Sequence, residues 1–182
     1  MARVCGADEV LAFWFEESGP KRWFKKSERF DQICRERFLA THQAAAHGEC
    51  WNWRTTSAGR CAEIIVLDQF SRNLYRDSAK AFATDLMALV LSQEVVLGEY
   101  DRSMTQDQRY FCYMPYMHSE SLALQAESVR LFTMLGREEA LRYAHAHRHV
   151  IERFVRYPHR NGILGRANTE EEIEYLKTNS GF

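Results

Sequence analysis

Apolar residues at helical spacing, interrupted mainly by glycine and proline, are the feature that most constrains the fold of this chain. Through most segments, large apolar side chains recur three or four positions apart, as on one face of an amphipathic helix. The three prolines stand at positions 20, 115 and 158, and most of the nine glycines fall between the periodic segments. The sequence has no strand-like alternation and no hairpin dipeptide. This pattern predicts an all-α fold.

The most apolar segment begins near Thr56 and continues to Leu74. Its apolar residues point nearly all round a helix, which predicts a central, buried helix. We expect a single domain over residues 1–182, with a core from about 7 to 176, in which about seven to eight helices pack as antiparallel hairpins. The expected helices cover about 8–17, 27–47, 56–74, 78–98, 105–115, 120–135, 137–156 and 169–176.

Charge and cysteine content exclude several classes of function. A formal net charge of −1 and an isoelectric point near 6.7 provide no general attraction to nucleic acid or to an anionic membrane. The five cysteines are scattered without a C-x-x-C pair, which argues against a disulfide framework or a zinc knuckle and for a reducing compartment. The start of the chain lacks a signal-peptide pattern, and no apolar run could span a bilayer. We therefore expect a cytoplasmic protein without a cofactor.

Two interpretations fit the charged residues of the central segment LDQFSRN, residues 67–73. Asp68 and Arg72 are four positions apart and face the same way on a helix. Because their neighbours are aliphatic, both charges are expected to be partly buried, where an unpaired charge is costly. They could form an ion-paired network between helices. Alternatively, Arg72 and Asn73 could face a ligand, with Asp68 orienting the arginine.

A histidine and a carboxylate lie close together in the sequence just after Pro115. His118 and Glu120 follow Pro115, at an expected boundary between a loop and a helix. A histidine beside a carboxylate suits general acid–base chemistry, because the pKa of histidine lies near neutrality, at about 6.5. The alternative is that His118 satisfies backbone carbonyls while Glu120 complements the helix dipole.

Three further histidines alternate along an expected helix. His145 and His149 share one face, and His147 lies on the other. The H-E-x-x-H spacing of a zinc site is missing. The sequence therefore indicates surface histidines and no metal site.

The stretch RFVRYPHRNGILGR, residues 153–166, concentrates positive charge and hydrogen-bond donors. Arg153, Arg156, His159, Arg160 and Arg166 could converge on a phosphate or a carboxylate, since arginine suits two-pronged contacts with such groups. Pro158 should end the preceding helix. The acidic residues at 170–172 and 174 offer an opposing interpretation, in which they neutralise the arginines.

Several of these motifs together resemble a known family. The similarity is to the bacterial domain-of-unknown-function family nine-twenty-four, and it extends from about residue 7 to 176. The resemblance implies a one-domain, tetratricopeptide-like helical fold, with no established activity, substrate or cofactor. This chain has Ser71 where the family usually has proline, and Val155 where it usually has glycine. The motifs that carry the resemblance, in chain order, are VLxFWF (10–15), LDQFSRN (67–73), FATD (82–85), YMP with HSE (113–120), and YPHRN with LGR (157–166).

Two hypotheses of function follow from these residues. In the first, Asp68, Arg72, Asn73, Arg153, Arg160 and Asn161 line a polar pocket for a small anionic molecule. His118, Glu120 and His159 would then be the candidate catalytic residues of a metal-independent, hydrolase-like reaction. In the second, the chain is a tetratricopeptide-like interaction module that binds an acidic peptide segment. The near-neutral charge speaks against nucleic acid as a partner, and exposed aromatic residues would support a homodimer.

Overall fold

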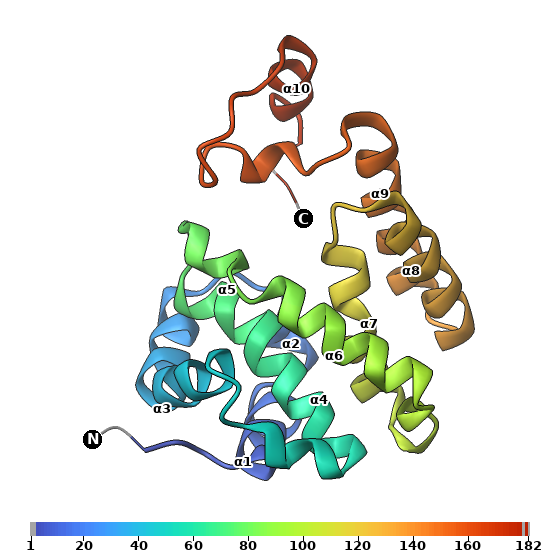
Figure 1. Cartoon of the computed structure of the whole chain (residues 1–182). Coiled ribbons are helices and arrows are strands. Elements are labelled where there is room, and N and C mark those ends of the chain that lie inside the picture. The colour runs from blue at the N-terminus through green and yellow to red at the C-terminus, as the bar shows by residue number, and fades with distance from the viewer. Residues whose placement is uncertain (1–2, 180, 182) are drawn as a thin grey trace. The chain divides into compact units, whose positions relative to one another are not determined.

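The computed structural model describes residues 3–179 and 181 of the chain, and its regular structure over these residues is helical, without a strand (Figure 1). The predicted all-α fold is therefore confirmed. Within the described residues, Cα packing groups the chain into two compact units. Unit 1 comprises the described residues up to Arg76 together with Lys80–Pro115, and unit 2 comprises Asp77–Ala79 and the described residues from Tyr116 onward. The single domain expected from the sequence stays a prediction.

Unit 1 begins with a helical segment that changes from α-helical to π-helical hydrogen bonding. Helix α1 (Ala7–Leu11) continues without a break into η1 (Ala12–Ser18), which is π-helical. The short helix α2 (Pro20–Trp23), which the sequence analysis did not separate, precedes α3 (Glu28–Ala46). The Ser27 side chain caps α3 by accepting a hydrogen bond from the Phe30 backbone N–H.

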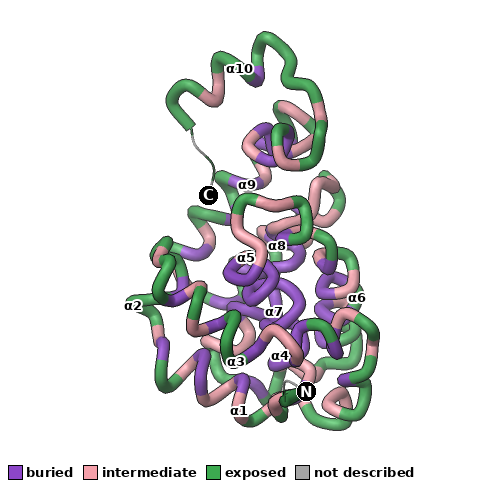
Figure 2. Tube along the Cα trace, turned by 90° about the vertical axis from the view of Figure 1, so that its left-hand side faces the viewer, coloured by how far each residue is buried: buried purple, intermediate pink, exposed green. Residues whose placement is uncertain are grey.

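The central helix predicted over residues 56–74 is present and consists of three consecutive parts. These are α4 (Ser57–Ile65), the π-helical η3 (Val66–Phe70) and α5 (Ser71–Leu74). Thr56 caps the first part, with its hydroxyl accepting from the Gly59 N–H at 3.0 Å. Figure 2 shows this stretch mostly in the colour of buried residues. The predicted buried position is confirmed.

The next helices along the chain, which lie mostly in unit 1, depart from the prediction at two places. Helix α6 (Asp85–Leu97) begins later than expected, because the single turn η4 (Ala79–Phe82) precedes it. Helix α7 (Gln106–His118) runs through Pro115, where an interruption was expected. Proline removes one backbone hydrogen bond, and the almost complete burial of the flanking α7 side chains offsets that loss. The 3₁₀ turns η2 (Trp51–Thr55) and η5 (Tyr100–Ser103) connect these elements.

Aromatic rings fill the core of unit 1. The ring centroids of Phe38 and Phe70 lie 4.8 Å apart, as do those of Trp23 and Phe111. Trp14 is fully buried and meets Phe111 edge-on at 5.3 Å. Edge-on and tilted pairs are the arrangements that the ring quadrupole favours. The core therefore joins η1, α2, α3, the central helix and α7.

Unit 2 is built around a pair of helices, α8 (Leu122–Leu135) and α9 (Glu138–Phe154), which pack along each other (Figure 1). Gly136, at φ 73°, ends α8 as predicted. Helix α8 begins at Leu122, two residues later than expected, and Ser121 precedes it. Helix α9 ends at Phe154, two residues earlier than expected. The single turn η6 (Pro158–Arg160) and the helix α10 (Glu170–Leu176) complete the unit.

None of the described helices is long and apolar enough to cross a lipid bilayer.

Candidate functional site

Asp68 and Arg72 form the ion pair that their spacing predicts, and Asp85 joins them. The Arg72 guanidinium reaches Asp85 through two contacts, Nη1–Oδ1 at 2.9 Å and Nη2–Oδ2 at 3.0 Å. Its Nη1 also lies 3.2 Å from Asp68 Oδ1 and donates to the Asp68 carbonyl at 2.7 Å. Asp85 was not among the predicted site residues, and it belongs to another helix, α6. Arg72 therefore connects η3 to the start of α6.

Asn73 belongs to a second network in unit 1. Its Nδ2 donates to Asp31 Oδ1 at 2.8 Å. Arg76 forms a two-pronged ion pair with the same carboxylate, at 2.5 and 2.7 Å. Burial raises the pKa of Asp31, but the hydrogen bonds from Arg76 and Asn73 outweigh it and hold the pKa below its usual range. This network joins α3 to the end of α5.

Glu120, in unit 2, precedes α8 and contacts the arginine-rich stretch 153–166, which we call the basic loop. Arg166 Nη1 donates to Glu120 Oε2 at 2.6 Å, and Arg166 Nη2 donates to Oε1 at 2.9 Å. The backbone N–H of Tyr157 also donates to Oε1, at 2.8 Å. Burial raises the pKa of Glu120, yet these donors hold it below its usual range. Glu120 is thus an ionised group that fixes the loop after α9.

Two other arginines of the loop pair with acids of α10. Arg153 Nε donates to Glu171 Oε1 at 2.7 Å in an exposed ion pair. Arg156 forms a two-pronged pair with Glu172, at 2.6 and 2.7 Å. The side chain of Arg156 and the hydrogen bonds at the helix cap lower the pKa of Glu172 to about 2. The neutralisation that the acidic segment suggested is therefore real for these two arginines.

Arg160 is the most buried arginine of the loop, with 7% of its surface exposed. Its guanidinium carbon lies 4.5 Å from the centroid of the Tyr157 ring. The ring of His159 lies 5.6 Å from that of Tyr157. Burial lowers the pKa of His159 to about 4, and the charge of Arg160 lowers it further in the same direction. The two residues thus share a positively charged environment around Tyr157.

His118, at the end of α7, faces a histidine that the sequence analysis assigned to the surface. The rings of His118 and His147 are 6.4 Å apart, and His147 lies 5.7 Å from Tyr157. His147 is buried, and its Nδ1 is 2.8 Å from the Tyr143 carbonyl oxygen. Burial, and then the nearby His118, lower the pKa of His147 to about 3. The surface prediction was wrong for His147 and correct for His145 and His149, which are exposed.

The burial of His147 had a signal in the sequence. Ala140, Ala144 and Ile151 occupy the same helical face as His147, and all three are buried. A histidine in register with such a stripe is expected to face the core. The alternation of three histidines obscured this longer periodicity.

Tyr157 holds the cluster together through its hydroxyl group. Its Oη donates to the Met117 carbonyl at 2.6 Å and accepts from Gln125 Nε2 at 2.9 Å. Asn161 is fully buried, and its Nδ2 donates to Asn168 Oδ1 at 2.7 Å. Tyr157 and Gln125 were not among the predicted site residues, although Tyr157 is part of the YPHRN motif.

The structure therefore sorts the predicted site residues into two groups. Asp68, Arg72 and Asn73 belong to networks of unit 1. Unit 2 contains His118, Glu120, Arg153, His159, Arg160 and Asn161. Within unit 2, His118, His147, His159 and Arg160 gather around Tyr157, and we call these four residues with Tyr157 the Tyr157 cluster. Over the residues that the structure describes, no group of three or more histidine, cysteine or acidic side chains is placed to hold a metal ion.

A family model for bacterial proteins of unknown function (DUF924) matches residues 10–180. The chain belongs to this family. The resemblance inferred from the motifs is confirmed, and the match covers the Tyr157 cluster as well as the networks of unit 1.

A solved structure of a protein of unknown function from Agrobacterium tumefaciens, ATU0120, is similar to this member of the DUF924 family. The two chains are 38% identical, with a TM-score of 0.91, over 95% of this chain and 97% of the other. The similarity extends through both units. A search among curated proteins gave no match.

Proposed function

We propose that this DUF924 protein binds a small anionic molecule at the Tyr157 cluster of unit 2. The observation that carries the proposal is the burial of Arg160 beside three imidazole rings. A buried guanidinium can donate two parallel hydrogen bonds to a carboxylate or a phosphate.

The titration of the neighbouring histidines supports a positive potential at this place. The charge of Arg160 contributes to lowering the pKa of both His147 and His159. A bound anion would oppose that contribution and raise both pKa values. Binding should therefore take up protons, and affinity should increase as the pH falls below neutrality.

If the Tyr157 cluster also acts on the bound anion, the reaction that we propose is hydrolase-like and independent of a metal. His159 would accept a proton from the ligand, since burial keeps its imidazole neutral at pH 7. His118 is the second candidate for proton exchange. Glu120 would act by positioning the loop, because its carboxylate already accepts from Arg166 and from Tyr157 N–H.

Anion binding can be tested by thermal unfolding and calorimetry with inorganic phosphate, sulfate, succinate and citrate. A ligand that binds the folded state raises the midpoint of unfolding. We expect at least one anion to raise it in the wild type and not in Arg160→Gln. Arg153→Gln is the matched control, because it removes an exposed arginine of the same loop.

Proton uptake provides a second measurement that does not depend on the stability of a variant. Calorimetry in two buffers of different ionisation enthalpy should report a net uptake of protons on binding at pH 6. Three results would refute the proposal: no response to any of the anions, binding without proton uptake, or equal loss of binding in Arg153→Gln and Arg160→Gln.

An acidic peptide segment is a second candidate ligand, and a different region supports it. In unit 1, a cavity of about 460 Å³ near the start of α3 is lined by Lys21, Arg22, Lys25 and Arg29. Neither aspartate nor glutamate lines it, and all four cations are exposed. Such a basic pocket suits carboxylate side chains.

A fluorescent hexaglutamate peptide tests this second candidate. Its binding should weaken steeply with added salt and should be lost in Lys25→Gln/Arg29→Gln. The matched control is Arg3→Gln/Arg142→Gln, which removes the same charge elsewhere. If both double variants weaken peptide binding equally, the net charge of the protein explains the binding, and a specific peptide site is excluded.

A cytoplasmic location belongs to the same proposal. Its support is that all five cysteines are free thiols.

A further inference from the structure

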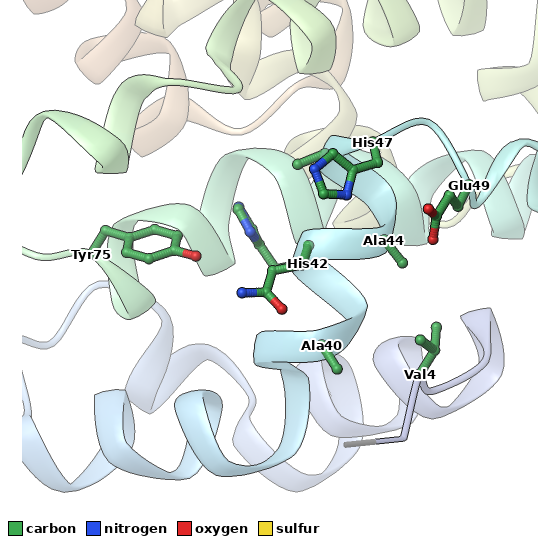
Figure 3. A pocket seen from close by; sticks show the side chains of 9 residues that line it. Val4, Ala40, His42, Ala44, His47, Glu49 and Tyr75 are labelled. Atoms are coloured by element: carbon green, nitrogen blue, oxygen red, sulfur yellow. The ribbon is translucent and has the colours of Figure 1, made fainter. Parts of the chain in front are cut away.

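A cavity of about 560 Å³ lies in unit 1 along the second half of α3. Its walls include Val4, His42, His47, Glu49 and Tyr75 (Figure 3). In Figure 3 the ring of Tyr75 lies on one side of His42, and His47 and Glu49 lie on the other. Small-molecule sites commonly have volumes of roughly 300–1,000 Å³. None of these residues belongs to the predicted site or to the Tyr157 cluster.

His42, at the wall of this cavity, contacts the Ser71 hydroxyl, which in turn contacts the Thr84 hydroxyl. Its Nε2 lies 2.6 Å from Ser71 Oγ. Ser71 Oγ lies 2.6 Å from the Leu67 carbonyl oxygen and 2.7 Å from Thr84 Oγ1. Thr84 Oγ1 lies 2.6 Å from the same carbonyl. These are hydrogen-bond distances throughout.

Counting protons in this network assigns the tautomer of His42. The two hydroxyls have one proton each, and the Leu67 carbonyl can only accept. The three contacts among the two hydroxyls and the carbonyl therefore have only two protons to fill them. Neither proton remains for the contact with His42. The imidazole therefore donates its own proton from Nε2 to Ser71 Oγ.

It follows that Nδ1 of His42 carries a lone pair. This atom is buried and has no hydrogen-bond partner. The whole residue is 4% exposed, and burial lowers the pKa of His42 to about 4, so the imidazole is neutral at pH 7. A buried acceptor without a donor is costly. A ligand that donates a hydrogen bond to Nδ1 would remove that cost.

The charges of the cavity wall indicate which donor fits. Glu49 is exposed, and its carboxylate is the acid among the lining residues, which include neither lysine nor arginine. The cation Lys80 lies nearby, with Nζ 5.9 Å from the Tyr75 ring centroid, but it does not line the cavity. Val4 and the Tyr75 ring provide apolar wall.

We propose that this cavity binds a small organic amine. The ammonium group donates a hydrogen bond to His42 Nδ1, and Glu49 balances its charge. The apolar part of the ligand packs against Tyr75 and Val4. This site is separate from the proposed anion site in its residues and in the sign of the charge that it selects.

Benzylamine is a suitable probe, with benzyl alcohol and benzoate as ligands of the same shape and different charge. Calorimetry at pH 7 should show binding of the amine, and binding of the other two that is at least about tenfold weaker. Glu49→Gln should weaken amine binding about threefold to tenfold. Glu28→Gln is the matched control, since Glu28 is an exposed acid of α3 outside the cavity.

His42→Gln tests the acceptor without removing the contact with Ser71. A glutamine amide nitrogen can occupy the place of Nε2 and donate to Ser71, while the Nδ1 acceptor is lost. Amine binding should then fall by about tenfold or more. In the wild type, nitrogen NMR of the His42 ring should show the proton on Nε2 and a change at Nδ1 when benzylamine is added.

Several outcomes would overturn the proposal. These are equal binding of benzylamine and benzyl alcohol, equal binding by His42→Gln and the wild type, and a proton on Nδ1 in the free protein. Tighter binding of benzoate than of benzylamine would show a site of the opposite charge preference. Loss of anion binding at Arg160 would leave this proposal untouched, because the two sites share no residue.

Discussion

Glu120 and Arg166 are 46 positions apart in the sequence and form a two-pronged ion pair, with contacts of 2.6 and 2.9 Å. Glu120 also accepts a hydrogen bond from the Tyr157 N–H. A single carboxylate at the start of α8 thus holds both ends of the basic loop. The shape of this loop, which presents Arg160 and His159, depends on that pair.

Replacing Glu120 with glutamine should destabilise the protein by about 2 kcal/mol, because Arg166 loses its charged partner. Chemical unfolding of Glu120→Gln, Arg166→Met and the double variant would give the coupling energy of the pair. We expect the double variant to be less destabilised than the sum of the single ones. Strict additivity would mean that the contact contributes nothing.

Protein stability should fall as the pH is lowered from about 6.5 to 4. The pKa values of His42 and His159 are about 4 and that of His147 is about 3 in the folded protein, against 6.5 for an unperturbed histidine. Between these values the unfolded state binds more protons, so stability is present above pH 6.5 and is lost as the pH falls. Each histidine can contribute a slope of at most about 1.4 kcal/mol per pH unit.

Urea unfolding at pH 7, 6 and 5 measures this dependence. His147→Gln should flatten it, because one of the three titrating groups is removed. His145→Gln, which changes an exposed histidine of the same helix, should leave the slope as in the wild type. A wild-type stability that is constant over this range would contradict the assignment of the histidines as neutral and buried.

Replacing Val155 with glycine should stabilise the protein by about 1 kcal/mol. Val155 ends α9 with φ at 62°, in the left-handed region, and 67% of its surface is exposed. A β-branched residue is strained there, whereas glycine is not. Glycine is also the residue that the family resemblance led us to expect at this position. Thermal and chemical unfolding would measure the gain.

Gly136, at the end of α8, allows the opposite substitution, from glycine to valine. Gly136 ends α8 at φ 73°, and its surroundings leave room for a side chain. Gly136→Val should therefore destabilise by about the amount that Val155→Gly stabilises. If the two substitutions change stability in the same direction, backbone strain is not the cause.

Removing Arg54 should destabilise unit 1 strongly, by about 3 kcal/mol or more. Glu63 is fully buried, and Arg54 pairs with it through two contacts of 2.7 Å. In Arg54→Met the carboxylate keeps its place without its partner. The second substitution in Arg54→Met/Glu63→Gln removes the buried charge and should restore part of the loss. Failure of this rescue in chemical unfolding would show that packing of the Arg54 stem matters more than charge.

Local signals account for the features that were predicted correctly. Ser27, Thr56 and Thr169 cap helices because each hydroxyl bonds to an N–H within the next three residues. The Gly136 helix end is equally local. Pro115 was misjudged because the loss of one hydrogen bond is a local effect, whereas the burial that offsets it comes from the surrounding core.

By itself, the sequence determined that this protein is helical, where most of its helices begin and end, and to which family it belongs. Apolar periodicity and capping act over three or four residues, so they are legible along the chain. Only the tertiary structure decided which charges meet. Asp85 pairs with Arg72 across 13 positions, and Ser71 meets His42 across 29. Such pairs depend on how helices pack, and packing brings together side chains whose spacing in the sequence has no regular period.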